Sequence, residues 1–150
     1  MATEVSGMIE CRPWAEIWGE DDGEVGWQAV IDLFVLNIGN AYDALACLFG
    51  VRNYFGFRPL AEGRGLPEDA SDGLRDAFQA QGGPEYAWGE TWVSWAELDA
   101  ADWKETEQSG SLSRSAVAGT ATHWAPVWDV MRTLAGLHGA EHVRLVVWFD

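Results

Sequence analysis

Hydrophobic residues follow strand-like patterns at both ends of the chain. Residues 5–12 alternate loosely between apolar and polar positions up to Pro13, and residues 143–149 form a nearly continuous apolar run. Alternation is typical of a half-buried strand, whereas an unbroken run is typical of a central strand covered on both faces. Residues 27–34 form another apolar segment, and the β-branched side chains of Val30, Ile31 and Val35 favour a strand over a helix there. We therefore expect strands at 5–12, 16–18, 27–34, 91–93 and 143–149, with a polar hairpin turn at 20–24.

Four segments have the spacing and the end signals of helices. Asn40 is the expected N-cap of a helix that ends before Gly50, and Ser71 is the expected cap of the next helix. Ser94 and Glu97 match a capping box. A proline in its first turn and a glycine at its end bound the last helix. These signals predict helices at about 40–49, 71–79, 95–103 and 125–137.

Two stretches show neither pattern. Residues 51–67 mix glycine, proline and arginine, and predict an ordered but irregular segment of a length that often carries function. Residues 106–120 are poor in apolar residues, so a mobile loop is expected there. The order of strands and helices, without regular βαβ alternation, predicts a single compact α+β domain over residues 1–150. Its sheet should be mixed or mainly antiparallel and accompanied by three to four helices.

The charge balance narrows the classes of function. The 150 residues include 24 Asp or Glu and nine Lys or Arg, which gives a formal net charge of -15. Direct binding of nucleic acid needs a basic surface, so we exclude it as the primary role. Mimicry of nucleic acid and binding to a basic protein stay open beside plain solubility. No secretory signal or membrane span is apparent, so we expect a cytoplasmic protein in which Cys11 and Cys47 are free and buried.

Signatures of common cofactor and nucleophile sites are missing from the sequence. It contains no phosphate-binding glycine loop, no dinucleotide fingerprint and no Gly-x-Ser-x-Gly elbow. His138 and His142 are four residues apart, but Gly139 interrupts the helix between them. We interpret these histidines as flanking a helix end and not as metal ligands. The acidic turn at 20–24 lacks calcium-loop spacing. We therefore predict no cofactor and no metal.

Arg52 and Arg64 are the most informative charges of the irregular segment 51–67. An arginine that enters a loop directly after a buried helix needs an anionic partner. The planar guanidinium suits bidentate binding of a carboxylate, which suggests an anion-binding pocket. The structural alternative is that both arginines pair with nearby acids and hold the loop in place. On the first strand, Glu10 and Arg12 share a face and suggest an ion pair.

Tryptophan is unusually concentrated in one part of the chain. Trp88, Trp92, Trp95 and Trp103 all lie between residues 88 and 103. If some of them are exposed, they suggest a binding surface, because tryptophan provides a large contact area at low entropic cost. The alternative is a small core built from tryptophan, with the indole N–H groups bonded to carboxylates.

The opening residues 1–10 and the segments Leu48–Asn53 and Trp92–Leu98 resemble a family of small proteins of unknown function found in phages and actinobacteria. Members typically begin Met-Gly-Thr-Asp-Ile-His-Gly, and this chain begins Met-Ala-Thr-Glu-Val-Ser-Gly. Further matching segments lie at 41–46, 59–61, 64–67 and 143–150. Glu4 stands where the family has Asp, and the family's histidines are missing here and at 83–90. The resemblance implies a phage or mobile-element origin and a lost Asp/His site, and it leaves Arg52, Asn53 and Arg64 as matching polar residues.

These observations lead to three hypotheses about function. The first is a non-enzymatic, acidic binding protein that contacts a protein partner, as an inhibitor or as a nucleic-acid mimic. Its expected binding residues are Arg52, Asn53, Arg64, Trp88, Glu90 and Trp92. The second is a metal-dependent or carboxylate-based hydrolase, degenerate or active, in which Glu4, Glu10 or Glu90 acts beside an Arg-lined anion pocket. The third is a homo-oligomer with the tryptophan segment at its interface.

Overall fold

The computed structural model describes residues 2–13 and 25–150, so the strand expected at 16–18 and the turn at 20–24 lie outside the described residues. The strands are β1 (Val5–Cys11), β2 (Gln28–Asp32), β3 (Trp88–Ser94) and β4 (Val143–Phe149). The α-helices are α1 (Tyr42–Phe49), α2 (Asp72–Ala80), α3 (Trp95–Ala100), α4 (Arg114–Ala118) and α5 (Ala125–His138). Short 3-10 helices are η2 (Leu33–Leu36), η3 (Gly83–Glu85) and η4 (Ala140–His142). The fold is α+β, as predicted. The described part contains five α-helices, whereas three to four helices were expected.

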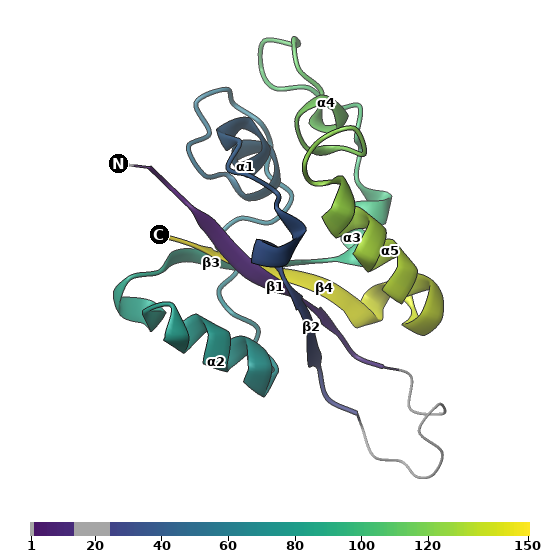
Figure 1. The fold of residues 1–150 in the computed structure, drawn as a ribbon. Coiled ribbons are helices and arrows are strands. Elements are labelled where there is room, and N and C mark those ends of the chain that lie inside the picture. The colour runs from purple at the N-terminus through teal and green to yellow at the C-terminus, as the bar shows by residue number, and fades with distance from the viewer. Residues whose placement is uncertain (1, 14–24) are drawn as a thin grey trace.

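The strands form one antiparallel sheet in the order β2-β1-β4-β3 (Figure 1). β4 pairs with β1 along its whole length and all seven of its residues are buried, which confirms the prediction of a doubly covered inner strand. β2 is shorter than the predicted 27–34. It ends at Asp32, whose carboxylate accepts the N–H of Phe34 and caps η2.

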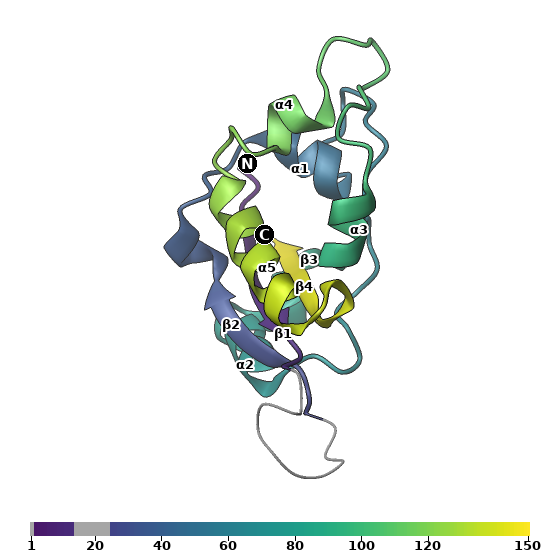
Figure 2. The same cartoon turned by 90° about the vertical axis from the view of Figure 1, so that its right-hand side faces the viewer.

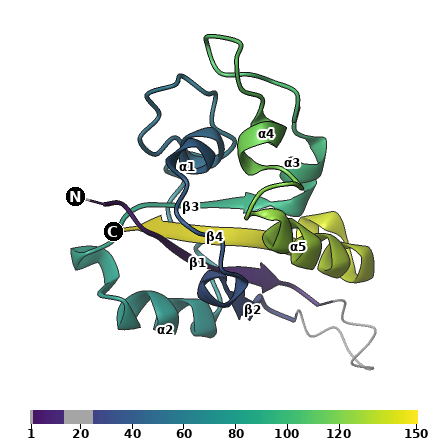
Figure 3. The same cartoon turned by 45° about the horizontal axis from the view of Figure 1, so that its top comes forward.

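Helices cover both faces of the sheet. α2 lies on one face, where Leu74 and Phe78 pack against Val146 and Trp148 of β4 (Figure 3). The other helices lie on the opposite face and build the larger part of the core, and α5 runs in front of the sheet in Figure 2. Successive strand residues point to opposite faces, so Leu145 joins one core and Val146 the other.

Two of the predicted helix caps are confirmed and one is wrong. Ser71 accepts the backbone N–H of the third residue of α2, and Ser94 and Glu97 form the complete capping box of α3. Asn40 does not cap α1, which begins without a side-chain cap. The Asn40 amide instead donates to the backbone carbonyl of Thr3, because the segment before β1 runs alongside it.

The stretch 106–120 contains regular structure where a loop was expected. α4 lies within it, capped by Ser113, and Thr106 and Ser113 form an isolated β-bridge. The Glu107 carboxylate is buried and accepts backbone N–H groups of the turn that follows it. Polar contacts order the turn after Glu107, and Val117 and Ala118 of α4 pack into the main core, so few apolar residues are enough to fix this segment.

The two cysteines are free and buried, as predicted. Burial raises the pKa of the Cys47 thiol to about 12 and also raises that of Cys11, although the nearby Arg114 partly opposes the effect at Cys47. Within the described part of the chain, no helix is long and apolar enough to span a membrane.

Candidate functional site

A row of polar side chains crosses the sheet on the face that carries α2. Glu10 of β1, Arg144 of β4 and Ser94 of β3 are register partners in adjacent strands. Arg144 Nε donates to Glu10 Oε1 over 2.7 Å, and both side chains are buried. The other oxygen of Glu10 accepts the N–H of Ser71, also over 2.7 Å. The predicted Glu10–Arg12 ion pair is wrong, because Arg144 binds the carboxylate and Arg12 donates to the Val25 carbonyl instead. The Ser71 bond links Glu10 to the start of α2.

Arg144 makes further contacts beyond the sheet. Its Nη1 donates to Asp69 Oδ1 over 2.9 Å, and the ring of Trp27 lies 3.8 Å from its guanidinium carbon. The Trp27 indole N–H donates to Asp69 Oδ2 over 3.1 Å. Burial raises the pKa of Asp69, but the bonds from Arg144 and Trp27 outweigh it and hold the pKa below its usual value. Arg144 Nη2 is buried and lacks a hydrogen-bond partner among the described residues.

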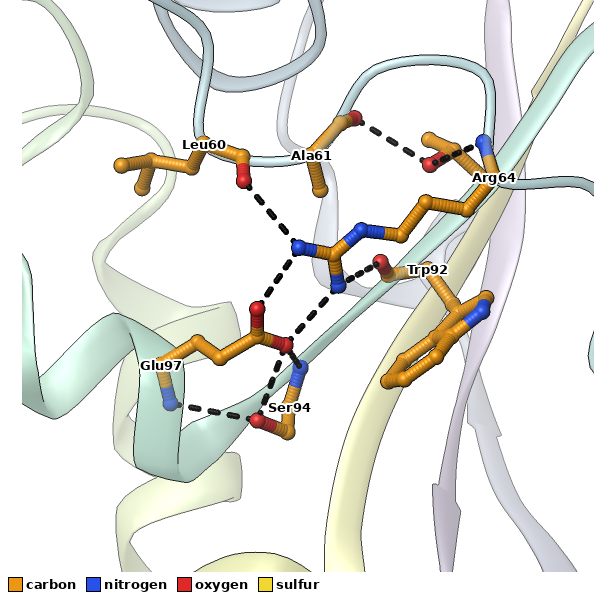
Figure 4. Close-up of polar contacts among 7 residues, drawn as sticks. Leu60, Ala61, Arg64, Trp92, Ser94 and Glu97 are labelled. Carbon is orange, nitrogen blue, oxygen red and sulfur yellow. Dashed lines mark hydrogen bonds and ion pairs between the residues drawn. The ribbon is translucent and has the colours of Figure 1, made fainter.

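Arg64 covers part of the outer edge of β3. Its guanidinium forms a two-pronged pair with Glu97, at 2.9 Å from Nη1 to Oε1 and 2.6 Å from Nη2 to Oε2 (Figure 4). Nη1 also donates to the Trp92 carbonyl, and the Trp92 ring lies 4.9 Å from the guanidinium carbon. The N–H of Gly65 donates to the carbonyl of Glu90. These bonds satisfy edge groups that could otherwise recruit another strand.

The Arg64–Glu97 pair changes the titration of both groups. Hydrogen bonds from Arg64 lower the pKa of Glu97 to about 2, while burial acts in the opposite direction. The bond to Glu97 likewise raises the pKa of Arg64. Arg64 thus pairs with an acid and ties the irregular segment to α3, which is the structural alternative weighed for this residue.

A cleft of about 500 Å³ lies beside these two arginines. Its lining residues are Arg64, Leu66, Pro67, Glu68, Asp69, Trp92 and Arg144. Because both arginines are already paired with carboxylates, the cleft presents no excess of positive charge. Its lining offers a ligand the Trp92 ring and guanidinium donors, so it suits a neutral group with hydrogen-bond acceptors better than a strong anion.

Arg52 and Asn53 do not line this cleft. Arg52 Nε donates to Thr3 Oγ1 over 2.8 Å, and its guanidinium lies 4.6 Å from the ring centre of Tyr42. The Asn53 side chain donates to the carbonyl of Phe57 and accepts its N–H, which closes a local turn. Of the six predicted binding residues, the structure therefore gathers Arg64, Trp92 and the backbone of Glu90, and it places Arg52 and Asn53 in other contacts.

The tryptophan cluster is partly surface and partly core. Trp88 is 45% exposed, and its ring packs against that of Phe149 with 5.4 Å between centroids. Tyr86, just before β3, is 68% exposed. Trp95 is buried and Trp103 is half-buried within the main core. The surface interpretation therefore fits Trp88, and burial in the core fits Trp95 and Trp103. The Trp103 indole N–H donates to the backbone carbonyl of Leu98 and not to a carboxylate.

The carboxylates of the hydrolase hypothesis occupy different environments. Glu10 has no exposed surface and is bonded to Arg144. Glu4 is exposed, and its backbone pairs with Asp150 at the end of the sheet. Glu90 is half-buried on β3. Across residues 2–13 and 25–150, no group of three or more His, Cys, Asp or Glu residues is placed to hold a metal ion.

The sequence pattern did not identify Arg144 and Asp69 as members of the polar cluster around Glu10. The available signal was the position of Arg144 inside the apolar run 143–149, since a charge in a doubly covered strand needs a buried partner. The identity of the partners depends on strand register, which the sequence pattern does not supply. No family model, curated protein or solved structure matches the chain.

Proposed function

We propose that this protein is a non-enzymatic, acidic binding protein that contacts a partner protein. The observation that carries the proposal is the exposure of two aromatic side chains, Tyr86 just before β3 and Trp88 at its first position. Glu85 and Glu90 flank them in the chain. We call Glu85, Tyr86, Trp88 and Glu90 the acidic aromatic surface.

The aromatic part of this surface has features of a binding hot spot. The Trp88 ring rests on the buried Phe149, so its position is largely set before any partner arrives. A pre-positioned aromatic side chain loses little entropy on binding and can bury a large area. Gly89, at a φ of +67° between Trp88 and Glu90, lies where the pairing of β3 with β4 is irregular. Such bulges redirect side chains at sheet edges.

The charge of the chain supports a basic partner. A net charge of -15 favours encounter with a positively charged surface and opposes encounter with acidic proteins. In the finer form of the proposal, the partner is a nucleic-acid-binding protein, and the acids of this chain occupy the place of phosphates. The resemblance to small phage proteins is in keeping with an inhibitory role of that kind.

The hydrolase hypothesis receives less support from the same residues. Its acids would need access to substrate and a shared cleft, whereas Glu10 is enclosed and neutralised by Arg144. Arg64, the candidate anion binder of this hypothesis, already holds Glu97 with both terminal nitrogens of its guanidinium group. Glu10 and Arg64 instead support the sheet and its edge.

A capture experiment with two matched double variants tests the proposal. The tagged chain, Tyr86→Ala/Trp88→Ala, and the control Tyr54→Ala/Phe55→Ala are each incubated with lysate of the source organism. The control also removes two exposed aromatic side chains, which are 85% and 50% exposed. We expect one partner with the wild type and the control, and at least about tenfold less with the test variant.

Salt and added DNA refine the result. Raising the salt from about 50 to 500 mM should release the partner, because the attraction is screened. Release by added DNA would support a nucleic-acid-binding partner whose phosphate site is occupied by the acids of this chain. Equal capture by both double variants, or no capture by the wild type, would contradict the proposal. Thermal unfolding of each variant confirms that it is folded.

A further inference from the structure

A second pocket lies on the opposite side of the sheet from the arginine cleft and has a different chemistry. It is a cavity of about 280 Å³ among α3, α4 and α5. Its lining residues are Trp95, Leu98, Asp99, Trp103, Ser115, Gly119, Thr120, Trp128 and Arg132. Trp95, Leu98 and Asp99 share a face of α3, because residues three and four apart are neighbours on a helix. Trp128 and Arg132 share a face of α5 for the same reason.

The tryptophan walls of the pocket are fixed by bonds to the protein itself. The Trp103 indole N–H donates to the Leu98 carbonyl over 2.8 Å, and that of Trp128 donates to the Ala118 carbonyl over 2.6 Å. Trp103 and Trp128 meet edge to face at 5.9 Å, and Trp124 stacks behind Trp128 at 5.5 Å. These two rings are therefore held in place with their polar atoms satisfied, and they require nothing polar from a ligand.

The rim of the pocket carries one charge of each sign. Arg132 lies over the Trp95 ring, 5.4 Å from its centre, and pairs with Asp129. It already occupies the position that a cationic ligand would take over that ring. Asp99 is exposed at the same rim and, with the net charge of the chain, disfavours an anion. The hydroxyls of Ser115 and Thr120 provide neutral hydrogen-bonding groups.

We infer that this pocket binds a neutral, planar aromatic group with one hydrogen-bonding atom turned toward the rim. A cavity of about 150 Å³ holds benzene, and pockets for drug-sized ligands begin at about 300 Å³, so the volume here fits a one- or two-ring group. The same chemistry could come from a free aromatic metabolite or from an aromatic side chain of a partner. The inference is independent of the acidic aromatic surface.

The indole N–H signals of the ten tryptophans provide a direct readout. The protein labelled with ¹⁵N is titrated with indole and, separately, with N-acetyl-tryptophanamide, and the signals are assigned with single Trp→Phe variants. We expect saturable shifts confined to Trp95, Trp103, Trp128 and the adjacent Trp124, with a dissociation constant for indole of about 1 mM or below. N-acetyl-tryptophanamide carries the backbone groups of a protein side chain, whereas indole is the bare ring. Shifts with both probes therefore assign the pocket to an aromatic side chain of a partner, and shifts with indole alone assign it to a free aromatic molecule.

A matched pair of variants on α4 separates binding in the pocket from binding elsewhere. Ser115→Phe places a ring at the lining, whereas Ala116→Phe adds the same ring one residue away at an exposed position outside it. We expect indole affinity to fall at least about tenfold in the first and to be unchanged in the second. Thr120→Phe replaces Ser115→Phe if that variant does not fold. Shifts that do not saturate, shifts that include Trp27 and Trp88 equally, or unchanged affinity in the blocked variant would overturn the inference.

Discussion

Replacing Glu10 by Gln removes a buried charge from the centre of the sheet while keeping the side-chain volume. In the wild type, one carboxylate oxygen accepts from Arg144 Nε and the other from the N–H of Ser71, each over 2.7 Å. Glutamine has only one oxygen, so its NH₂ group must face one of these two donors. Glu10→Gln therefore loses one charge-assisted hydrogen bond and leaves Asp69 as the one anion paired with Arg144 among the described residues.

The structure sets the size of the expected effect. Glu10 is 0% exposed and the Arg144 side chain is 6% exposed, so water cannot replace the lost interaction. Removing one partner of a buried ion pair costs about 3 to 5 kcal/mol. Because Asp69 remains bonded to Arg144, we expect the lower limit, about 3 kcal/mol. For a chain of this length, that corresponds to a decrease in Tm of about 6 to 12 °C.

Urea unfolding followed by tryptophan fluorescence measures this loss. Glu4→Gln is the control, because Glu4 is exposed near the same strand, and it should change the free energy of unfolding by less than about 0.5 kcal/mol. A second variant, Glu10→Leu/Arg144→Met, removes both buried charges and should recover much of the stability. A loss below about 1 kcal/mol in Glu10→Gln would refute the reasoning, as would a double variant less stable than the single one.

Three further outcomes follow from individual sites. The folded pKa of Glu97 is about 2 against an ordinary 4.5, so its stabilisation is present above pH 4.5 and is lost as the pH falls toward 2. The stability advantage of the wild type over Glu97→Gln, about 1 kcal/mol for a partly exposed pair with Arg64, should vanish over that range in acid titrations of unfolding. Cys11 and Cys47 should resist a thiol reagent at pH 8 in the folded protein and react upon unfolding, because burial raises both pKa values; rapid native labelling would contradict this. Gly7→Ala should lower the free energy of unfolding in urea by about 3 kcal/mol or more, because the added Cβ would lie 2.1 Å from a backbone oxygen of β4. An unfolding midpoint equal to that of the wild type would show that the two strands can move apart to admit the methyl group.

The sequence determined the features that depend on neighbouring residues in the chain. The capping box of α3 needs only Ser94 and Glu97, and it forms as predicted. The inner strand β4 follows from its apolar run, because only a strand covered on both faces can bury every residue. Gly139 ends α5 through its own backbone conformation, with a φ of +102°. Each of these signals operates over a few residues, so no knowledge of the rest of the fold is required.

Tertiary structure decided the partners of the polar side chains. Asparagine is a residue type that often caps helices, yet the side-chain amide of Asn40 donates to the backbone carbonyl of Thr3, which is far away in sequence. Glu10 bonds Arg144 and Arg64 bonds Glu97 because strand register and the path of segment 51–67 bring them together. A hydrogen-bonding side chain can be satisfied by many groups, and its choice is fixed only when the backbone is in place. For that reason the sequence indicated which residues needed partners, and only the folded chain determined which partners they have.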